Sequence, residues 1–422
     1  MIDLKWLAEH QREAEEGFTA KGCDVPIAAM LTLDAERKRI LQKVEAVAAE
    51  KHAASKELGK LSPKVREEKL AVLRALDASN DADAKRLKDV EQELHELVWN
   101  VPNLPLSDVP VGKDGTENVV ERTVGERPSF DFTPRPYWEL GATLGVFDTE
   151  RGAKVSGSRF GYLTGPGALL EFAMLNHAMR VLTAEGFTPV IPPALINANA
   201  MEAMGYTIHG QRTETYYFEQ DDQYLIGTSE QSIGPMHMDE ILDETDLPKR
   251  YVAFSPCFRR EAGSYGKDTK GIFRVHQYDK VEMFSFTTPE QSLAEHEYLL
   301  GLEERLLQDV GLPYQVLKMC TGDLGIQAAR KFDLEAWFPA EGAYRELTST
   351  STCTDWQARR LNIRYRPKDG GAPRFVHTLN GTAWSMNRPI CAILENFQQA
   401  DGTVMVPEVL RPWLGMDRIT AA

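Results

Sequence analysis

The 422-residue sequence predicts an α+β protein in which a long antiparallel helical hairpin, a coiled coil, precedes a mainly antiparallel sheet flanked by helices. Three observations carry this prediction. A stretch near the N-terminus has apolar residues at helical spacing, a segment rich in proline and glycine follows it, and the remainder alternates between strand-like and helix-like runs. A chain of this length is long for one hydrophobic core, so two domains are expected.

The helical hairpin is predicted between Leu33 and Val98. The apolar positions of its first half are Ile40, Val44, Val47 and Leu58, and those of its second half are Leu70, Leu73, Leu76, Leu87, Val90, Leu94 and Leu97. These positions lie mostly three or four residues apart, or at multiples of that, which indicates two amphipathic helices. A break at the sequence GKLSPK (residues 59–64) turns the second helix back along the first. The pattern alone leaves open a structural or dimerising coiled coil and an arm that contacts RNA.

The charge of the chain is distributed unevenly. The net charge is −15, but residues 34–98 carry equal numbers of basic and acidic residues, so the whole excess lies outside the hairpin. An acidic body argues against nonspecific binding of nucleic acid by the whole surface. A neutral arm rich in lysine can still bind RNA selectively.

Composition also indicates the environment of the protein. No apolar run approaches the roughly 20 residues that span a bilayer, and the N-terminal sequence is too charged for a signal peptide, so we expect a cytoplasmic protein without membrane contact. The five cysteines are scattered, without a CxxC pair, and therefore predict neither disulfides nor a zinc site.

A linker is predicted at residues 101–118, where three prolines and two glycines occur. Beyond it, the strand-like runs are YLIG (224–227), RYVAFSPCF (250–258) and RVHQYDKVEMFSF (274–286), and the helical runs are residues 167–186 and 292–311. Apolar and polar residues alternate along several of the strands, which favours an antiparallel sheet with one buried face.

The segment CFRREAGSYGKDTKGIFRVHQYDKVEMF (257–284) gathers charged residues on two predicted strands. Because side chains alternate between faces, Arg259 and Glu261 are expected to share a face from which Arg260 points away. At even steps along the second strand, Arg274, Tyr278, Lys280 and Glu282 are expected to share a face as well. This pattern fits a solvated, salt-bridged sheet and equally fits arginines that bind a phosphate beside an aromatic ring that stacks on a base.

Three further stretches carry polar residues in similar patterns. LIGTSEQ places Thr228 and Glu230 two residues apart, and AYRELTSTST (343–352) contains Glu346 and Ser349. In HTLNGTAWSMNRPICAILEN (377–396), Pro389 suits the first turn of a helix, so Arg388 is expected at a helix N-terminus, where anions bind favourably. Each stretch taken alone can be structural.

Together these stretches resemble the bacterial-type seryl-tRNA synthetases, which are class II aminoacyl-tRNA synthetases. The resemblance covers essentially the whole chain: GFTPVIPPAL (186–195) is similar to the first class II motif, with Pro193 at a dimer interface, residues 257–282 to the second and residues 378–396 to the third. It implies an N-terminal tRNA-binding helical-arm domain at 1–104, a linker at 105–118 and a class II catalytic domain at 119–422. The third motif has Ala383, Ser385 and Asn387 where class II enzymes often have glycine.

The resemblance also implies an activity and its residues. A serine–tRNA ligase forms seryl-adenylate from L-serine and ATP and transfers serine to the 3′ end of tRNA(Ser), and we expect tRNA(Sec) as a further substrate. The catalytic residues would be Arg259, Arg388 and Glu346. The ATP-binding residues would be Arg259, Arg260, Glu261, Arg274, Val275, Tyr278, Glu346, Leu347, Thr348, Ser349 and Arg388. The serine-binding residues would be Thr228, Ser229, Glu230, Arg259, Glu282, Asn380 and Thr382.

Individual roles follow from the same resemblance. Arg259 would bind the α-phosphate and the carboxylate of serine, Tyr278 would stack on adenine, and Glu346 with Ser349 would bind Mg²⁺ together with ATP. The helical arm would contact the long variable arm of the tRNA, and the enzyme would be a homodimer. Two rivals stay open: an enzyme that activates serine for a carrier protein or small molecule, and an inactive RNA-binding paralogue.

Overall fold

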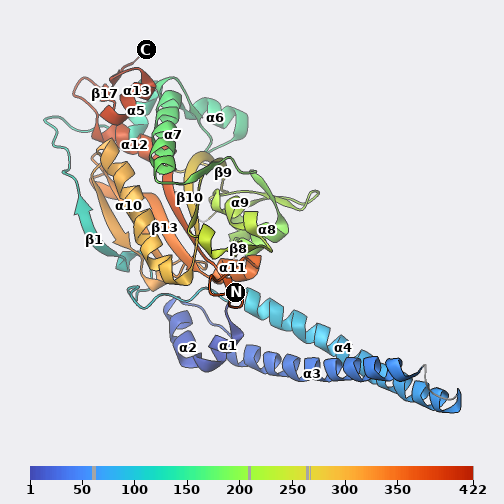
Figure 1. Ribbon diagram of the computed structural model, residues 1–422. Helices are drawn as coiled ribbons and strands as arrows, with labels where there is room; N and C mark the ends of the chain where they lie inside the picture. Colours follow the sequence, from blue (N-terminus) through green and yellow to red (C-terminus); the bar gives the residue numbers. More distant parts are fainter. Residues whose placement is uncertain (59–62, 208–210, 263–265, 267, 422) are drawn as a thin grey trace. The chain divides into compact units, whose positions relative to one another are not determined.

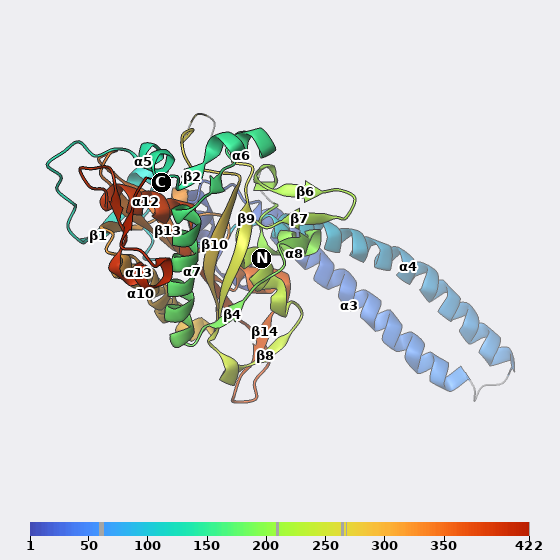
Figure 2. The same cartoon turned by 90° about the horizontal axis from the view of Figure 1, so that it is seen from above.

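Two long helices account for most of the first hundred residues. The computed structural model describes residues 1–58, 63–207, 211–262, 266 and 268–421. Within them, α3 (Ile27–Leu58) and α4 (Pro63–Trp99) lie side by side and antiparallel (Figures 1 and 2). Of the break predicted at residues 59–64, residues 59–62 lie outside the described residues, and Pro63 is the first residue of α4.

The paired helices bury part of the apolar pattern, including Leu94 of α4. Ile40 of α3 and Val90 of α4 are buried, and the guanidinium of Arg86 donates to both carboxylate oxygens of Glu36 at 2.9 and 3.0 Å. The sequence analysis missed two short helices that precede them, α1 (Leu4–Glu9) and α2 (Gln11–Ala20). Leu7 of α1 and Phe18 of α2 are also buried.

The contacts of the chain divide it into two units, Met1–Pro102 and Asn103–Ala422. The proline-rich segment predicted as a linker belongs to the second unit from Asn103 onward. The Nδ2 atom of Asn103 donates to the carbonyl oxygens of Gln327 and Cys353 at 2.8 and 2.7 Å, and Val109 packs in a small apolar cluster. The functional domain boundaries 1–104, 105–118 and 119–422 stay a prediction.

A large sheet organises the second unit. Its eight described strands lie in the order β1 (Val119–Val124), β11 (Tyr314–Lys318), β12 (Arg330–Phe338), β13 (Ala343–Thr354), β16 (His377–Ser385), β10 (Gln277–Thr287), β9 (Lys249–Phe258) and β4 (Thr188–Val190). Neighbouring strands are antiparallel except β4 and β9, which are parallel. The predicted α+β class with a mainly antiparallel sheet is confirmed.

Helices cover one face of this sheet and leave polar side chains on the other. The covering helices are α7 (Pro166–Ala184), α10 (Ser292–Val310) and α12 (Asn387–Asn396), grouped on one side of β9 and β10 in Figure 2. Val281 and Met283 of β10 point into the hydrophobic core that these helices complete. Because side chains alternate along a strand, Lys280 and Glu282 point to the opposite face.

Two β-bulges change the alternation where the polar face matters. Leu347 of β13 has no partner on β12, since Glu335 pairs with Glu346 and Leu334 with Thr348. Ala383 of β16 is unpaired on β10 in the same way. A bulge turns the strand by one side chain, so residues three apart, which would otherwise face opposite ways, share one face.

Smaller elements surround the sheet. They are α5 (Tyr137–Thr143), β2 (Phe147–Asp148), α6 (Thr149–Ser156), β3 (Tyr162–Leu163), β5 (Leu195–Asn197), α8 (Ala198–Met204), β6 (Tyr216–Phe218), β7 (Gln223–Leu225), α9 (Glu230–Ile233), β8 (Ile241–Asp243), α11 (Trp356–Leu361), β14 (Arg364–Arg366), β15 (Arg374–Phe375), β17 (Val404–Met405), α13 (Arg411–Leu414) and β18 (Arg418–Ile419). Among the described helices, none is both long and apolar enough to cross a membrane.

Candidate active site

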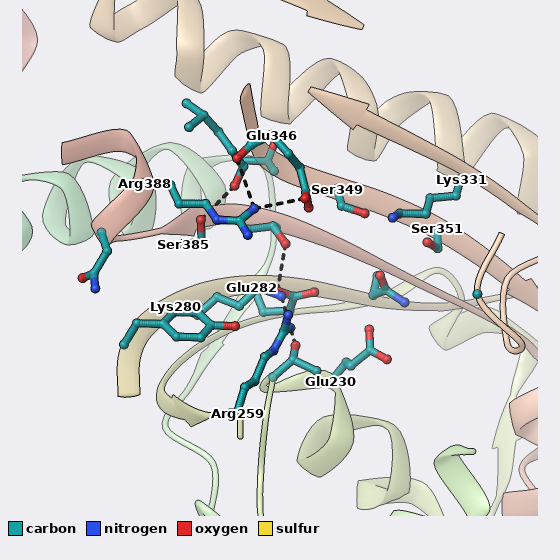
Figure 3. Close-up of a pocket in the computed structure, with 18 of the residues that line it drawn as sticks. Glu230, Arg259, Lys280, Glu282, Lys331, Glu346, Ser349, Ser351, Ser385 and Arg388 are labelled. Carbon is teal, nitrogen blue, oxygen red and sulfur yellow. Dashed lines mark hydrogen bonds and ion pairs between the residues drawn. The ribbon is translucent and has the colours of Figure 1, made fainter. Parts of the chain in front are cut away.

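A cavity of about 260 Å³ opens on the polar face of the large sheet. Its walls come from β10, β13 and β16, the start of α12 and the connections around β7, β9 and β12. Figure 3 shows Arg259, Glu230, Glu282 and Lys280 along one side and Arg388, Glu346 and Ser349 along the other. The predicted site residues that line the cavity are Thr228, Glu230, Arg259, Glu261, Arg274, Val275, Tyr278, Glu282, Glu346, Leu347, Thr348, Ser349, Asn380, Thr382 and Arg388.

The prediction that Arg259, Glu261 and Arg274 lie on strands was wrong, whereas Tyr278, Lys280 and Glu282 do lie on β10. β9 ends at Phe258 and β10 begins at Gln277, so Arg259, Glu261 and Arg274 lie in the connection between them. Regular pairing ends because the main-chain N–H of Arg260 donates to the carbonyl oxygen of Glu214. Glu261 then adopts a left-handed φ of 52°, unusual for a residue other than glycine. The connection nevertheless brings Arg259 and Glu261 to the cavity.

Two predicted residues lie off the cavity. The Nε atom of Arg260 donates to the carbonyl oxygen of Thr215 at 2.8 Å, and its guanidinium lies 4.6 Å from the centre of the Tyr216 ring. Ser229 is fully buried and its hydroxyl hydrogen-bonds that of Ser255. Neither side chain lines the cavity wall, so the predicted ATP contact of Arg260 and the predicted serine contact of Ser229 find no side-chain support in this geometry and stay predictions.

Thr228 and Glu230 line the cavity without sharing a strand face. β7 ends at Leu225, and Glu230 is the first residue of α9. The hydroxyl of Tyr206 donates a short hydrogen bond to Glu230 Oε1. Burial, together with the nearby charge of Glu282, raises the pKa of Glu230 to about 7.

Glu282 carries the second carboxylate at this end of the cavity, and it is paired. The Nζ atom of Lys280 forms a close ion pair with Glu282 Oε2 and donates to Thr228 Oγ1 at 3.1 Å. The hydroxyl of Thr382 also donates to Glu282 Oε2, at 3.4 Å. Burial raises the pKa of Glu282, whereas the ammonium of Lys280 lowers it.

Arg259 lies between the two ends. Its Nε atom donates to the carbonyl oxygen of Gly227 at 3.1 Å, and its guanidinium lies 5.7 Å from the centre of the Tyr278 ring. The Tyr278 hydroxyl donates to the same carbonyl oxygen at 3.2 Å. These contacts hold the guanidinium of Arg259 at the cavity wall.

The opposite end of the cavity combines a carboxylate, a hydroxyl and an arginine. The bulge at Leu347 turns Glu346 to the same side as Ser349, three residues later. Arg388 is the second residue of α12, at the helix N-terminus as the position of Pro389 predicted. Loss of water raises the pKa of Glu346, but Arg388 and Lys331 more than offset this effect and lower it to about 2.

Arg274, which lines the cavity, bridges two carboxylates. Its Nη1 atom lies 2.6 Å from Glu261 Oε2 and its Nε atom 3.3 Å from Asp268 Oδ2. Asp268 also accepts from Arg345 at 2.7 Å. Residues 263–265 and 267 of the connecting loop lie outside the described residues.

The sequence analysis missed several residues of the wall. Phe273 lies under the Arg388 guanidinium, 5.0 Å from ring centre to Cζ, and Asn387 donates to the carbonyl oxygen of Ile272 at 3.2 Å. Lys280 shares its strand face with Glu282, a signal that was available. The others come from loops or neighbouring strands and carry no local signal: Tyr206, Gln327, Lys331, Ser351 and Cys353. Trp384, which lies in the segment similar to the third motif, is buried in the core.

Known proteins resemble this chain in sequence and in structure. Residues 1–105 match the seryl-tRNA synthetase N-terminal domain, and residues 215–397 match the tRNA synthetase class II core domain (G, H, P, S and T). A serine–tRNA ligase from Thermobifida fusca is 49% identical, with 99% of this chain and 98% of that protein covered. One from Nitratidesulfovibrio vulgaris is 42% identical over the full length of both chains.

The solved structures agree. Seryl-tRNA synthetase from Pyrococcus horikoshii complexed with ATP superposes with a TM-score of 0.92 at 38% identity, with 100% of both chains covered. The cytoplasmic serine–tRNA ligase of Naegleria fowleri in complex with AMP superposes with a TM-score of 0.86 at 30% identity, covering 100% of this chain and 99% of that one. With its class II core, its helical N-terminal region and relatives along its whole length, this chain belongs to the seryl-tRNA synthetase family.

Proposed function

We propose that this chain activates L-serine with ATP, forming seryl-adenylate and pyrophosphate, and then transfers the seryl group to the 3′ end of tRNA(Ser). The observation that carries the proposal is the arrangement of one cavity, in which Arg259 lies between two buried carboxylates, Glu230 and Glu282, and the Glu346–Arg388 pair. Membership of the family supports the same activity.

The nucleotide end would hold ATP through arginine and aromatic contacts. Arg388 and Arg274 would bind phosphate oxygens, and Glu261 would accept from the adenine amino group. Tyr278 would stack on adenine, because the guanidiniums of Arg345 and Arg388 already lie over the Phe273 ring, at 4.3 and 5.0 Å from its centre. The remaining wall would come from Val275, Leu347 and Thr348.

The donor atoms at this end fit Mg²⁺, which prefers hard oxygen ligands. Glu346 offers a carboxylate that stays ionised because its pKa is about 2, and Ser349 offers a hydroxyl on the same side of the strand. Bound together with ATP, the ion would neutralise negative charge on the phosphate oxygens.

The other end would hold serine as a zwitterion. Glu230 would bind the ammonium group, Glu282 with Thr382 and Asn380 would bind the hydroxyl, and Arg259 would bind the carboxylate and the α-phosphate together. Two anions that must react are thereby aligned and partly neutralised, so no strong base is required. The carboxylate attacks the α-phosphorus in line and pyrophosphate leaves. Alanine would be rejected because it leaves the hydroxyl-binding groups unpaired.

The helical hairpin would bind the tRNA. We propose that α3 and α4 contact the long variable arm of tRNA(Ser), and that tRNA(Sec) is charged as well. Recognition of backbone and shape suits a lysine-rich surface without a net charge. The exposed cations of α3 include Arg39 and Lys43.

The first motif would form the interface of a homodimer. Apolar side chains there are unusually exposed: Phe172 of α7 is 57% exposed, Ile191, which follows β4, is 84% exposed, and Trp413 of α13 is 43% exposed. Met179, Pro189, Ile191 and Trp413 line one shallow depression, and Pro193 is exposed nearby in sequence. A second copy of this chain would cover these side chains.

The deciding experiment is ATP–pyrophosphate exchange measured with each of the twenty amino acids. We expect exchange with serine and much less with alanine or threonine; no exchange with serine would contradict the proposal and favour the inactive paralogue. Active enzyme is then offered tRNA(Ser), tRNA(Sec) and a carrier protein. Serine transferred to the carrier and to neither tRNA would favour the rival enzyme.

The dimer is tested by light scattering of the wild type and of I191E.

A further inference from the structure

The serine end of the cavity contains a lysine that has no role in the activity described so far. Lys280 lies on β10, two residues before Glu282, and its side chain is 8% exposed. A buried ammonium group is costly unless it is paired and hydrogen-bonded. The burial of Lys280 must therefore be offset by its contacts with other side chains.

Its two contacts are the side chains of two proposed serine-binding residues. The Nζ atom of Lys280 forms a close ion pair with Glu282 Oε2 and lies 3.1 Å from Thr228 Oγ1. Glu282 is on the same strand, whereas Thr228 comes from the connection between β7 and α9. One ammonium group thus joins two walls of the cavity.

We propose that Lys280 is a positioning residue of the serine subsite, which holds Glu282 as a carboxylate and fixes the direction of the Thr228 hydroxyl. This inference rests on the proposed function. An ammonium group only donates hydrogen bonds, so Thr228 Oγ1 must act as the acceptor toward Lys280. The proton of that hydroxyl then points elsewhere, and among the described residues it meets no protein acceptor, which leaves it for a substrate oxygen.

The same contact selects one oxygen of Glu282. Lys280 and Thr382 both approach Oε2, so Oε1 is the oxygen left to accept a hydrogen bond from the serine hydroxyl. The same contact also balances the charges of the proposed serine subsite. Lys280 neutralises Glu282, Glu230 remains for the ammonium of serine, and Arg259 remains for its carboxylate. Without Lys280, two unpaired carboxylates would face one small zwitterion.

The test uses the full-length enzyme and serine-dependent exchange. K280M removes the charge and keeps the length of the side chain. We expect the KM for serine to rise by about 30-fold or more, since a hydrogen bond to a charged group is lost, while the KM for ATP changes by about twofold or less. The preference for serine over alanine should fall in parallel. K280R, which keeps a cation, should recover part of the serine KM.

K318M is the matched control. Lys318 lies on β11 of the same sheet, is 14% exposed and is paired with Asp108 at 2.7 Å, but it lies outside the cavity wall. The K318M variant should have the same KM for serine as the wild-type enzyme. If K280M does not fold, K280Q replaces it, because its neutral amide, one atom shorter than the lysine side chain, removes the ion pair with Glu282 while it keeps a polar group at this position.

Three outcomes would overturn the inference: an unchanged serine KM in K280M or K280Q, equal increases in the KM for serine and for ATP, or K280R as defective as K280M. A double variant, K280M/E282Q, gives an independent measure. The fold-increase in its KM for serine should be well below the product of the fold-increases measured for K280M and E282Q separately, because Lys280 acts through Glu282. Absence of exchange in the wild-type enzyme would instead contradict the proposed function and is distinguished in the same assay.

Discussion

Arg388 Nη1 lies 3.1 Å from the Oε2 atom of Glu346 and 3.1 Å from the main-chain carbonyl oxygen of the same residue. One nitrogen thereby fixes both the strand and its carboxylate against the N-terminus of α12. Because Arg388 favours the ionised form, the pKa of Glu346 is held at about 2, far below the working range of an enzyme near neutral pH.

The first prediction concerns this carboxylate. E346Q keeps the shape but removes a charged oxygen ligand, so exchange should fall by about 10²-fold or more and require much higher Mg²⁺ concentrations. Chelation of divalent ions should abolish exchange by the wild type, and added Mg²⁺ should restore it. The activity should show no titration of Glu346 down to pH 5. An E346Q enzyme with the normal Mg²⁺ dependence would contradict the assignment.

The second prediction is a pH dependence of serine use. The pKa of Glu230 lies near 7, and the carboxylate must be ionised to bind the ammonium of serine. The kcat/KM for serine should therefore fall as the pH drops below 7, approaching about tenfold per pH unit, and level off above it. The KM for ATP serves as the internal control. A serine profile that is flat between pH 5.5 and 8 would exclude Glu230 from this role.

The third prediction follows from the same group but concerns stability. Folding raises the pKa of Glu230 from 4.5 to about 7, so the folded state binds the proton more tightly and stability falls as the pH rises through this window. E230Q should increase the free energy of unfolding by up to about 3 kcal/mol at pH 8 and very little at pH 4.5. It should also lose serine activation. Denaturant unfolding at the two pH values measures the difference.

The fourth prediction compares two adjacent arginines. R259A should lower exchange by about 10³-fold, because it removes the cation proposed to bind both reacting anions, while tRNA binding persists in a filter assay. R260A should keep exchange within about fivefold, since its side chain bonds to Thr215 and lies on Tyr216 away from the cavity. Equal losses in both variants would contradict the geometry of the connection between β9 and β10.

The fifth prediction separates the hairpin from the chemistry. Arg39 and Lys43 are exposed one turn apart on α3, so R39E/K43E should lower the kcat/KM for tRNA(Ser) by about tenfold or more through lost phosphate contacts. Serine-dependent exchange should be unaffected. K113E reverses an exposed charge in the other unit and should leave charging intact. Loss of exchange in R39E/K43E would show a defect other than tRNA binding.

Sequence patterns predicted the large elements well because their signals are local. The apolar spacing that includes Ile40 lies within α3, and the spacing that includes Val90 lies within α4. Pro389 marks the start of α12, with Arg388 directly before it. The family resemblance also predicted most of the charged residues that line the cavity, because it rests on residue identities at matched positions and needs no knowledge of the tertiary structure.

The failures arose where geometry depends on partners elsewhere in the chain. Arg259 and Glu261 left the strand because Glu214, far away in sequence, takes the next main-chain donor. Tyr206 reaches Glu230 from a loop, and nothing in its neighbours indicates a site. Ser229 and Arg260 sit beside true wall residues, and only their tertiary hydrogen bonds show that they turn away.

The bulges at Leu347 and Ala383 decide which side chains of β13 and β16 point to the polar face of the sheet. That face therefore depends on how many residues each strand contains, as well as on which residues they are. Excision of Leu347 would restore perfect alternation and shorten β13 by one residue, yet it would rotate Glu346 into the apolar layer against α12. Substitution at either bulge changes a side chain, whereas a single-residue deletion reverses a whole row of them. Evolution can therefore vary the chemistry of these strands far more freely than their length.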